Sequence, residues 1–187
     1  MPPRPRGALE VGDVVYLRRP SVRDKSEFVR LVRESRAFLR PWVFTAPQDA
    51  EEFNEFLRRV RRDNADGLLV CRREDDAIVG VYLVSQIVRG ALNSGYLAYY
   101  SFMAFTGRGY MTEGLGLVLR HVFGPMKLHR VEANIQPHNA PSIALVRRFG
   151  FRLEGYSPRY LKIGGSWRDH ERWALTIEDW RAGRSRR

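Results

Sequence analysis

The stretch 106-TGRGYMTE-113 joins a predicted strand to a predicted helix. Gly107 and Gly109 allow the backbone to turn tightly and to approach a ligand closely. The free N–H groups of the first helical turn lie at the positive end of the helix dipole, where phosphate groups bind, and Arg108 adds a permanent positive charge. The stretch therefore indicates a phosphate or pyrophosphate site, although two glycines before a helix often form only a turn. It lacks the third glycine of a Rossmann fingerprint and the Gly-Lys-Ser/Thr of a Walker loop.

The sequence on both sides of this stretch alternates between strand and helix patterns. Alternating, β-branched or aromatic residues predict seven strands, at residues 14–18, 67–72, 78–88, 96–105, 130–135, 151–161 and 168–176. Helical spacing predicts one helix from a cap at Ser21 or Asp24 to Phe38, a second around residues 53–60, and two more at 112–123 and 140–149. This order predicts an α/β fold, with a mixed seven-stranded sheet and helices on both of its faces.

The length of 187 residues, 44% of them hydrophobic, is sufficient for one sizeable core. We therefore expect a single domain at residues 13–180, preceded by a flexible segment at 1–12 and followed by a basic, disordered tail at 181–187. The longest apolar stretch, residues 77–88, is too short to span a membrane, which takes roughly 20 residues. The N-terminal residues do not have the pattern of a signal peptide, so we expect a cytoplasmic protein without a membrane partner.

The net charge of +11 comes almost wholly from arginine. A basic surface concentrates anionic partners such as RNA, the ribosome or coenzyme phosphates, but an arginine bias can also reflect genomic base composition. The sequence leaves both explanations open. Cys71 is the only cysteine, which excludes an internal disulfide and any zinc site built on several thiolates. We expect Cys71 to be a small buried residue in a strand.

Downstream of the glycine stretch, the predicted strand at 130–135 leads into a short polar loop, 136-QPHNAPS-142. Asn139 can cap the next helix and Ser142 lies in its first turn, so both residues have a purely structural interpretation as well as a functional one. Gly150 ends that helix before the next strand.

With these residues the chain resembles the GNAT acetyltransferases, specifically the RimJ and RimL type. Gly109 matches the central glycine of the family's acyl-CoA loop, while Thr106 and Met111 depart from its first and last residues. Asn139 and Ser142 match a second signature, Asn-x-x-Ser, which is followed by a Gly-Phe-x-x-Glu-Gly turn. The resemblance covers residues 14–180, with the closest local matches at 38–42, 87–90, 136–139, 154–156 and 167–170.

The resemblance implies that acetyl-CoA binds where two central parallel strands splay apart, at 100–105 against 131–135. The pantetheine arm would pair with main-chain groups of residues 102–105, and the pyrophosphate would lie on residues 108–112. No metal is implied. The implied coenzyme-binding residues are Phe102, Met103, Ala104, Phe105, Gly107, Arg108, Gly109, Tyr110, Met111, Thr112, Asn139 and Ser142.

The resemblance also implies direct attack of a neutral amine on the thioester, with Ser142 as proton donor to the departing thiolate and Asn139 in a positioning role. A free α-amine titrates near 7.7 to 8.0, so a protein base is optional. The carboxylate that some relatives use falls on Leu161 here, and no base is assigned. Asp169 and His170 could reach the acceptor from the last hairpin, although such roles are uncommon for residues there. Aromatic residues that could wall the acceptor pocket are Trp42, Tyr99 and Tyr100.

Three functions fit these features. The first is acetylation of a protein N-terminus, with a ribosomal protein as the first candidate acceptor. The second is acetylation of a small amine such as an antibiotic, a polyamine or an amino acid. The third is a non-catalytic acyl-CoA-binding or RNA-binding module. An acidic acceptor pocket would favour a polycationic drug, and an open groove would favour a peptide.

Overall fold

The computed structural model describes residues 4–43 and 46–184, which form one α/β domain. The strands are β1 (Ala8–Val11), β2 (Val15–Arg18), β3 (Asp66–Arg72), β4 (Ile78–Val88), β5 (Ser94–Ser101), β6 (Arg130–Ile135), β7 (Arg152–Ile163) and β8 (Ser166–Thr176). The α-helices are α1 (Lys25–Glu34), α2 (Arg36–Leu39), α3 (Ala50–Arg59), α4 (Tyr110–Phe123), α5 (Ala140–Arg148) and α6 (Ile177–Arg184). Two short 3-10 helices are η1 (Val22–Asp24) and η2 (Met103–Phe105).

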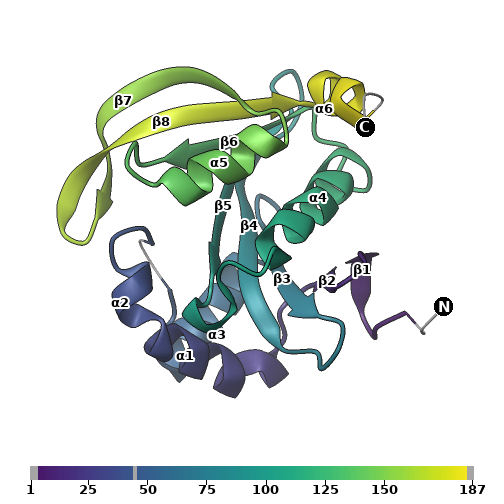
Figure 1. The fold of residues 1–187 in the computed structure, drawn as a ribbon, viewed down its shortest axis with the longest axis vertical. Coiled ribbons are helices and arrows are strands. Elements are labelled where there is room, and N and C mark those ends of the chain that lie inside the picture. The colour runs from purple at the N-terminus through teal and green to yellow at the C-terminus, as the bar shows by residue number, and fades with distance from the viewer. Residues whose placement is uncertain (1–3, 44–45, 185–187) are drawn as a thin grey trace.

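All eight strands belong to one sheet, in the order β1-β2-β3-β4-β5-β6-β8-β7. Every neighbouring pair is antiparallel except β5 and β6, which run parallel and pair only at Ser94 with Arg130, Gly95 with Val131 and Tyr96 with Glu132. In the described part of the chain these two strands form no ladder beyond Tyr96. Figure 1 shows the consequence: β6, β8 and β7 diverge from β4 and β5, so that the sheet opens in its centre.

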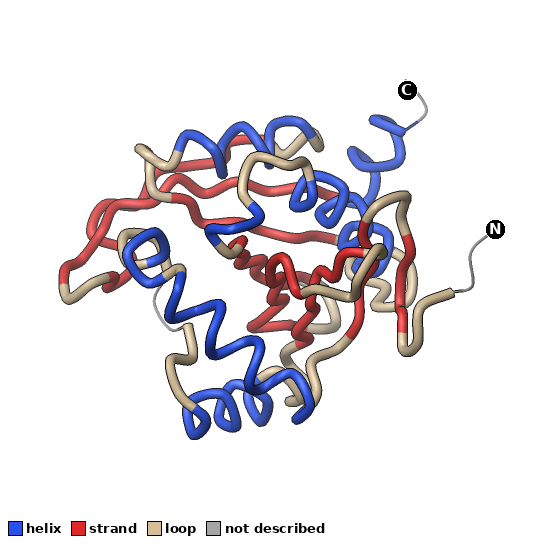
Figure 2. Tube along the Cα trace, turned by 60° about the horizontal axis from the view of Figure 1, so that its bottom comes forward, coloured by secondary structure: helices blue, strands red, loops and turns tan. Residues whose placement is uncertain are grey.

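Each face of the sheet has its own apolar core. On one face, α4 and α5 cover buried residues of the central strands, including Val70, Tyr82 and Trp173. On the other face, α1 and α3 pack Phe28, Phe53 and further apolar side chains against the sheet. In Figure 2, α1, α2 and α3 lie on one side of the strands, while α4 and α5 lie on the other. The predicted α/β class, with helices on both faces, is confirmed.

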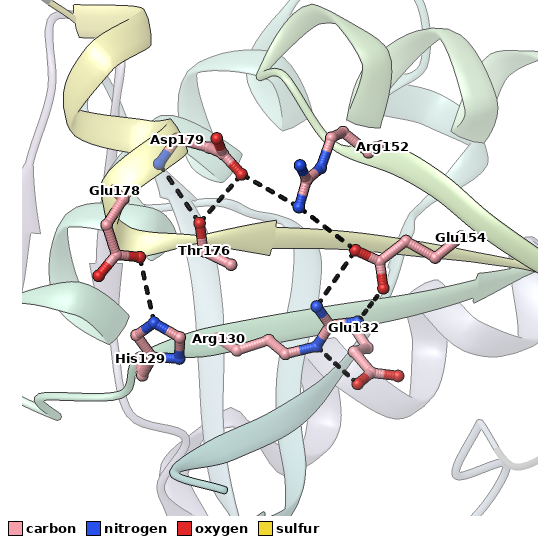
Figure 3. Close-up of polar contacts among 8 residues, drawn as sticks. All are labelled: His129, Arg130, Glu132, Arg152, Glu154, Thr176, Glu178 and Asp179. Carbon is pink, nitrogen blue, oxygen red and sulfur yellow. Dashed lines mark hydrogen bonds and ion pairs between the residues drawn. The ribbon is translucent and has the colours of Figure 1, made fainter.

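An ion-pair network links β6, β7 and α6 at the end where β5 and β6 remain paired (Figure 3). Arg130 of β6 bonds Glu132 of the same strand and Glu154 of β7. Arg152 of β7 bonds Glu154 and also Asp179 at the start of α6. This network joins two strands, β6 and β7, to α6 at the end of the sheet where β5 and β6 are still paired.

The structure corrects four expectations. The sheet has eight strands instead of seven, because residues 8–11 form β1 and pair with β2. These residues lie within the segment 1–12, which was expected to be flexible. The expected strand 96–105 ends at Ser101, where the chain turns into η2. The first expected helix divides into η1, α1 and α2. Of the expected disordered tail, residues 181–184 continue α6, and residues 185–187 lie outside the described part.

The structure also gives the surroundings of Cys71 and the lengths of the helices. Cys71 is buried, as expected, and burial raises the pKa of its thiol to about 11, so the thiol stays protonated at neutral pH. No helix among the described residues is long and apolar enough to cross a membrane.

Candidate active site

The loop before α4 has the backbone geometry expected of a phosphate-binding loop. Gly107 and Gly109 have φ angles of 72° and 80°, in the left-handed region that glycine adopts without strain. Gly109 is the N-cap of α4 and offers no side-chain acceptor to the first turn. The N–H groups of residues 110–112 therefore remain available at the positive end of a 14-residue helix.

The first turn of α4 is fixed to the sheet below it. The buried phenol of Tyr82, on β4, donates a hydrogen bond of 2.7 Å to the main-chain oxygen of Met111. Gly80 and Gly114 leave room for this approach, because a Cβ atom at Gly80 would lie 2.5 Å from the Met111 sulfur and one at Gly114 would lie 3.3 Å from the Tyr82 ring. The direction of the helix N-terminus is therefore set by the core.

Positive charge gathers around this helix N-terminus. Arg108 is exposed in the loop itself. The guanidinium carbon of Arg72 lies 5.5 Å from the ring centroid of Phe105 and 6.0 Å from that of Tyr110. Arg72 also pairs with Asp75, which holds the pKa of that carboxyl below its usual range. The site thus presents main-chain donors and the Arg108 guanidinium to an anion, while the Arg72 guanidinium is engaged by Asp75 and by the Tyr110 phenol.

Residues 102–105 cannot pair with a ligand as an extended strand. Phe102 is fully buried and its N–H bonds the Val79 oxygen, while the Met103 N–H bonds the Ser35 hydroxyl. The Phe105 N–H is used inside η2. The unpaired main-chain edge that faces the opening is instead the part of β5 beyond Tyr96, so the expected site of pantetheine pairing shifts toward residues 97–101.

Asn139 and Ser142 lie together at the start of α5. The Asn139 side-chain oxygen accepts a hydrogen bond of 3.3 Å from the Ser142 main-chain N–H, which is the geometry of a helix cap. Tyr99 of β5 donates from its phenol to the Ser142 main-chain oxygen at 3.3 Å. This contact brings the first turn of α5 against β5, across the opening of the sheet. The Asn139 side chain thus caps α5 in the structure, and the Ser142 hydroxyl takes no part in this cap.

A cavity of about 240 Å³ lies in the opening between β5 and β6. It joins the first turn of α5 to the β7–β8 hairpin and to the loop after α2. Among the described residues, its lining includes no aspartate, glutamate, lysine or arginine. The lining residues are Trp42, Ser85, Gln86, Tyr96, Leu97, Ala98, Tyr99, Asn134, Ile135, Gln136, Asn139, Ser142, Tyr160, Leu161 and His170.

The loop that carries Trp42 is tied to the end of β6. The Gln136 side chain donates a hydrogen bond of 2.7 Å to the Pro41 oxygen, and the rings of Trp42 and His138 lie 5.3 Å apart. Trp42 is held by these contacts at the mouth of the cavity. Two further residues of this loop, Phe44 and Thr45, lie outside the described residues.

Of the residues predicted to surround the acceptor, the structure brings Trp42, Tyr99, Asn139 and Ser142 to one cavity and separates Tyr100 from it. The Tyr100 ring packs edge-on against Phe102, with centroids 5.8 Å apart, in the core beneath α1 and α3. Successive strand residues face opposite sides of a sheet, and the two rings accordingly pack against different cores, Tyr99 against the one under α4 and α5 and Tyr100 against the one under α1 and α3.

Sequence reasoning missed several lining residues. Gln86 has a φ of 49° and lies at an irregularity in β4 between Ser85 and Val88, a feature that redirects a side chain near a site and that residue types alone do not reveal. Asn134 sits within an ordinary strand pattern, and only the divergence of β5 from β6 exposes it to the cavity. His170 was weighed from sequence without being assigned a role.

A larger groove of about 1190 Å³ lies along the outer side of α4, between β1, the C-terminal end of α5 and α6. Thr112 and Glu113 line its inner end. The Glu113 carboxylate accepts from the Val14 N–H at 3.1 Å, so this residue joins α4 to the β1–β2 turn, in agreement with a structural role. Asn139 and Ser142 do not line this groove.

Comparison with known proteins identifies the class. Residues 15–152 match the family model described as acetyltransferase (GNAT) domain. The chain is 34% identical to the ribosomal protein uS5 alanine N-acetyltransferase of Escherichia coli (strain K12) over 172 residues, 87% of each chain. It is 31% identical to the probable N-acetyltransferase YjcK of Bacillus subtilis (strain 168), over 90% of this chain and 97% of that protein.

A solved structure agrees with these matches. The structure of Mycobacterium smegmatis RimJ in complex with CoA-disulfide superposes with a TM-score of 0.82 at 30% identity, covering 88% of this chain and 82% of the other. The chain therefore belongs to the GNAT acetyltransferase family. It is an acetyl-CoA-dependent N-acetyltransferase, with acetyl-CoA as its co-substrate.

Proposed function

We propose that the protein transfers the acetyl group of acetyl-CoA to the N-terminal α-amine of a protein, with a ribosomal protein as the first candidate acceptor. The observation that carries this proposal is the cavity at the opening of the sheet, whose described lining has polar, aromatic and aliphatic side chains but no carboxylate. A polycationic antibiotic or polyamine would be bound poorly without acidic partners, whereas a single amine on a peptide needs none. The uS5 alanine N-acetyltransferase relative supports the same acceptor class. A ribosomal acceptor implies action in the cytoplasm.

In this proposal the coenzyme pyrophosphate accepts hydrogen bonds from the main chain of residues 109–112, and Arg108 adds charge. The pantetheine arm follows the unpaired edge of β5 past residues 97–101, toward the first turn of α5. The thioester then lies beside Ser142 and Asn139. The acceptor enters from the opposite side, between Trp42 and the β7–β8 hairpin.

The reaction requires a neutral amine, a polarised thioester carbonyl and a proton for the departing thiolate. The amine nitrogen attacks the carbonyl carbon, the carbon–sulfur bond breaks, and the nitrogen loses a proton as the amide forms. Ser142 is the proton donor to sulfur in this scheme, because its hydroxyl is in the first turn of the helix that borders the cavity. Asn139 holds that turn in place through the Ser142 N–H.

A mass-spectrometric acceptor screen tests the proposal. The purified enzyme and acetyl-CoA are incubated with peptides that begin with alanine or serine, with the same peptides blocked at the N-terminus but containing lysine, and with an aminoglycoside, a polyamine and free amino acids. We expect acetylation on the α-amine of the unblocked peptides. Turnover of only lysine side chains or of a small amine would contradict the proposed acceptor.

A further inference from the structure

We propose that His170 is the base that removes the proton from the acceptor's ammonium group. The inference rests on the proposed function and adds a catalytic residue to the same cavity. His170 lies on β8, in the hairpin that covers the acceptor side of the opening. Among the described lining residues, it is the only one whose ordinary pKa falls near neutral pH.

His170 lies across the opening from Ser142. Along β8, Trp173 and Leu175 belong to the core under α4 and α5. Strand alternation places His170 on the opposite face, which is the acceptor side. Asn139 and Ser142 approach the same cavity from α5. A reacting carbonyl between these walls would have a proton donor on one side and a proton acceptor on the other.

The protonation state of the His170 ring is set by its main-chain contact. Its side chain is only 2% exposed, and Nδ1 lies 3.0 Å from the Arg168 oxygen. A carbonyl oxygen only accepts, so Nδ1 must carry the hydrogen. In the neutral ring, Nε2 then holds a free lone pair. No described residue forms a hydrogen bond with Nε2, and this atom is therefore available to a substrate proton.

The surroundings keep the ring neutral at physiological pH. Burial lowers the pKa of His170, and the neighbouring His138 acts in the same direction, against the Arg168 contact and Asp169. The other titratable groups around it are the phenols of Tyr160, whose ring centroid lies 5.9 Å away, and Tyr96. The Asp169 carboxylate is occupied by the Arg159 N–H at 2.7 Å and by the Tyr156 phenol.

A second observation indicates that this cavity binds a group with hydrogen-bond donors. The side-chain oxygen of Asn134 is buried and has no hydrogen-bond partner among the described residues, yet Asn134 lines the same space. A buried acceptor without a donor is costly, and a substrate N–H would satisfy it. An ammonium group has three N–H donors, enough for both Asn134 and His170 Nε2.

In the proposed step, His170 takes the first of the two protons that the acceptor nitrogen loses. The acceptor enters as R-NH3⁺ and transfers one proton to Nε2 of neutral His170, which becomes an imidazolium. The resulting R-NH2 attacks the thioester carbon, and the carbon–sulfur bond breaks as Ser142 donates a proton to sulfur. The nitrogen then loses its second proton, which returns through water to the Ser142 oxygen, and the neutral amide remains. The imidazolium then releases its proton to water.

The test is the pH dependence of kcat/KM in His170→Gln, measured with the best acceptor found for the wild-type enzyme. We expect a loss of about 100-fold at pH 6.5, at the lower end of what a general base contributes. The loss should shrink to less than about tenfold at pH 9, because an α-amine of pKa near 7.7 to 8.0 is then already neutral. The affinity for acetyl-CoA should not change.

His129→Gln is the matched control, because His129 is exposed and bonds Glu178 at the other end of β6. It should keep the wild-type profile. A constant loss at every pH in His170→Gln, or no loss, would overturn the role of His170 as base. If the wild type acetylates no α-amine but does acetylate another amine, the proposed acceptor fails, and the same comparison with that amine still tests His170.

A spectroscopic measurement keeps the inference testable without turnover. In long-range nitrogen–proton NMR spectra of the enzyme with bound CoA, we expect His170 at pH 7 to be neutral with its proton on Nδ1. A charged ring, or a proton on Nε2, would overturn the assignment, because neither form can accept a proton from the substrate at that atom.

Discussion

At the scale of single residues, the structure separates two roles that share one helical turn. Asn139 caps α5 by accepting from the Ser142 N–H, so the Asn139 side chain is accounted for by stability. The Ser142 hydroxyl is not needed for that cap, since Ser142 contributes main-chain atoms to it and to the Tyr99 contact. The two residues of the Asn-x-x-Ser pattern should therefore respond differently to removal.

Ser142→Ala should fold, bind acetyl-CoA normally and lose turnover by roughly 100-fold to 10,000-fold, because the proposed proton donor to sulfur is lost. Asn139→Ala should instead lower the free energy of unfolding by about 1 kcal/mol, as expected for a lost cap. Single-turnover kinetics and urea unfolding measure the two effects. Near-normal turnover of Ser142→Ala when chemistry limits the rate would show that water or a phenol such as Tyr160 protonates the thiolate.

Gly109→Val should weaken acetyl-CoA binding by at least about tenfold, since valine at a φ of 80° costs about 1–3 kcal/mol and the loop would leave its binding conformation. Gly90→Val is the matched control: Gly90 has a φ of 77°, and a Cβ atom at either glycine would meet no atom within 4 Å. The control should lose comparable stability but keep its coenzyme affinity in calorimetry. Equal affinity in both variants would remove the loop from the site.

At the scale of elements, the sequence was most informative where a single pattern determines an element. The strands at 78–88 and 130–135 were predicted with their observed bounds, because long β-branched or alternating runs leave few alternatives. The glycine stretch also predicted the entry to α4 to within two residues. These are local features, and local chemistry is sufficient to recognise them.

The sequence could not indicate features that depend on distant partners. Residues 102–105 look like the end of a strand, but the Ser35 hydroxyl and the Val79 oxygen take their N–H groups and turn the chain into η2. β1 is only four residues long and depends on pairing with β2. The lining of the cavity by Gln86 and Asn134 follows from the divergence of β5 and β6, which no single segment encodes.

Tyr82→Phe tests how one element positions another. Loss of the 2.7 Å bond to the Met111 oxygen should lower the free energy of unfolding by about 1 kcal/mol. It should also weaken acetyl-CoA up to about fivefold, as the first turn of α4 loosens. Tyr16→Phe removes a comparable phenol contact, to Asp76, on the other face of the sheet, and should leave the affinity unchanged. A Tyr82→Phe enzyme with unaltered affinity would show that α4 is positioned by packing alone.

At the scale of the whole molecule, the residues proposed to bind the coenzyme and those proposed to bind the acceptor come from opposite faces of the open sheet. α4 and α5 bring the proposed phosphate-binding loop and Ser142 from one face, while Trp42 and the β7–β8 hairpin bring the proposed acceptor groups from the other. The two reactants would meet only in the opening, which begins beyond the paired end of β5 and β6, where Arg130 bonds Glu132 and Glu154 (Figure 3). The rigidity of the whole sheet is therefore a condition for the geometry of the site.

One buried carboxylate joins the layers of this assembly. Asp66, at the start of β3, bonds Arg19 beyond β2 at 2.9 Å and His121 of α4 at 3.0 Å. Burial opposes the charged form of Asp66, but the hydrogen bonds from His121 and Arg19 outweigh it and lower the pKa of this carboxyl below its ordinary value. A carboxyl with a lowered pKa in the folded state stabilises the fold above its unfolded pKa and loses that contribution as the pH falls through the folded value.

Asp66→Asn should therefore lower the free energy of unfolding at pH 7 by roughly 2 kcal/mol, less than for a fully buried pair because Arg19 is half exposed. The difference from the wild type should persist down to the ordinary carboxyl pKa near 3.9 and shrink below it, as the wild-type carboxylate becomes protonated. Urea unfolding between pH 3 and pH 8 measures it. Glu34→Gln, which removes an exposed pair with Arg30, should change stability by at most about 0.5 kcal/mol. A difference between Asp66→Asn and the wild type that stayed constant to pH 3 would mean that the shape of the side chain, and not its charge, joins β3 to α4.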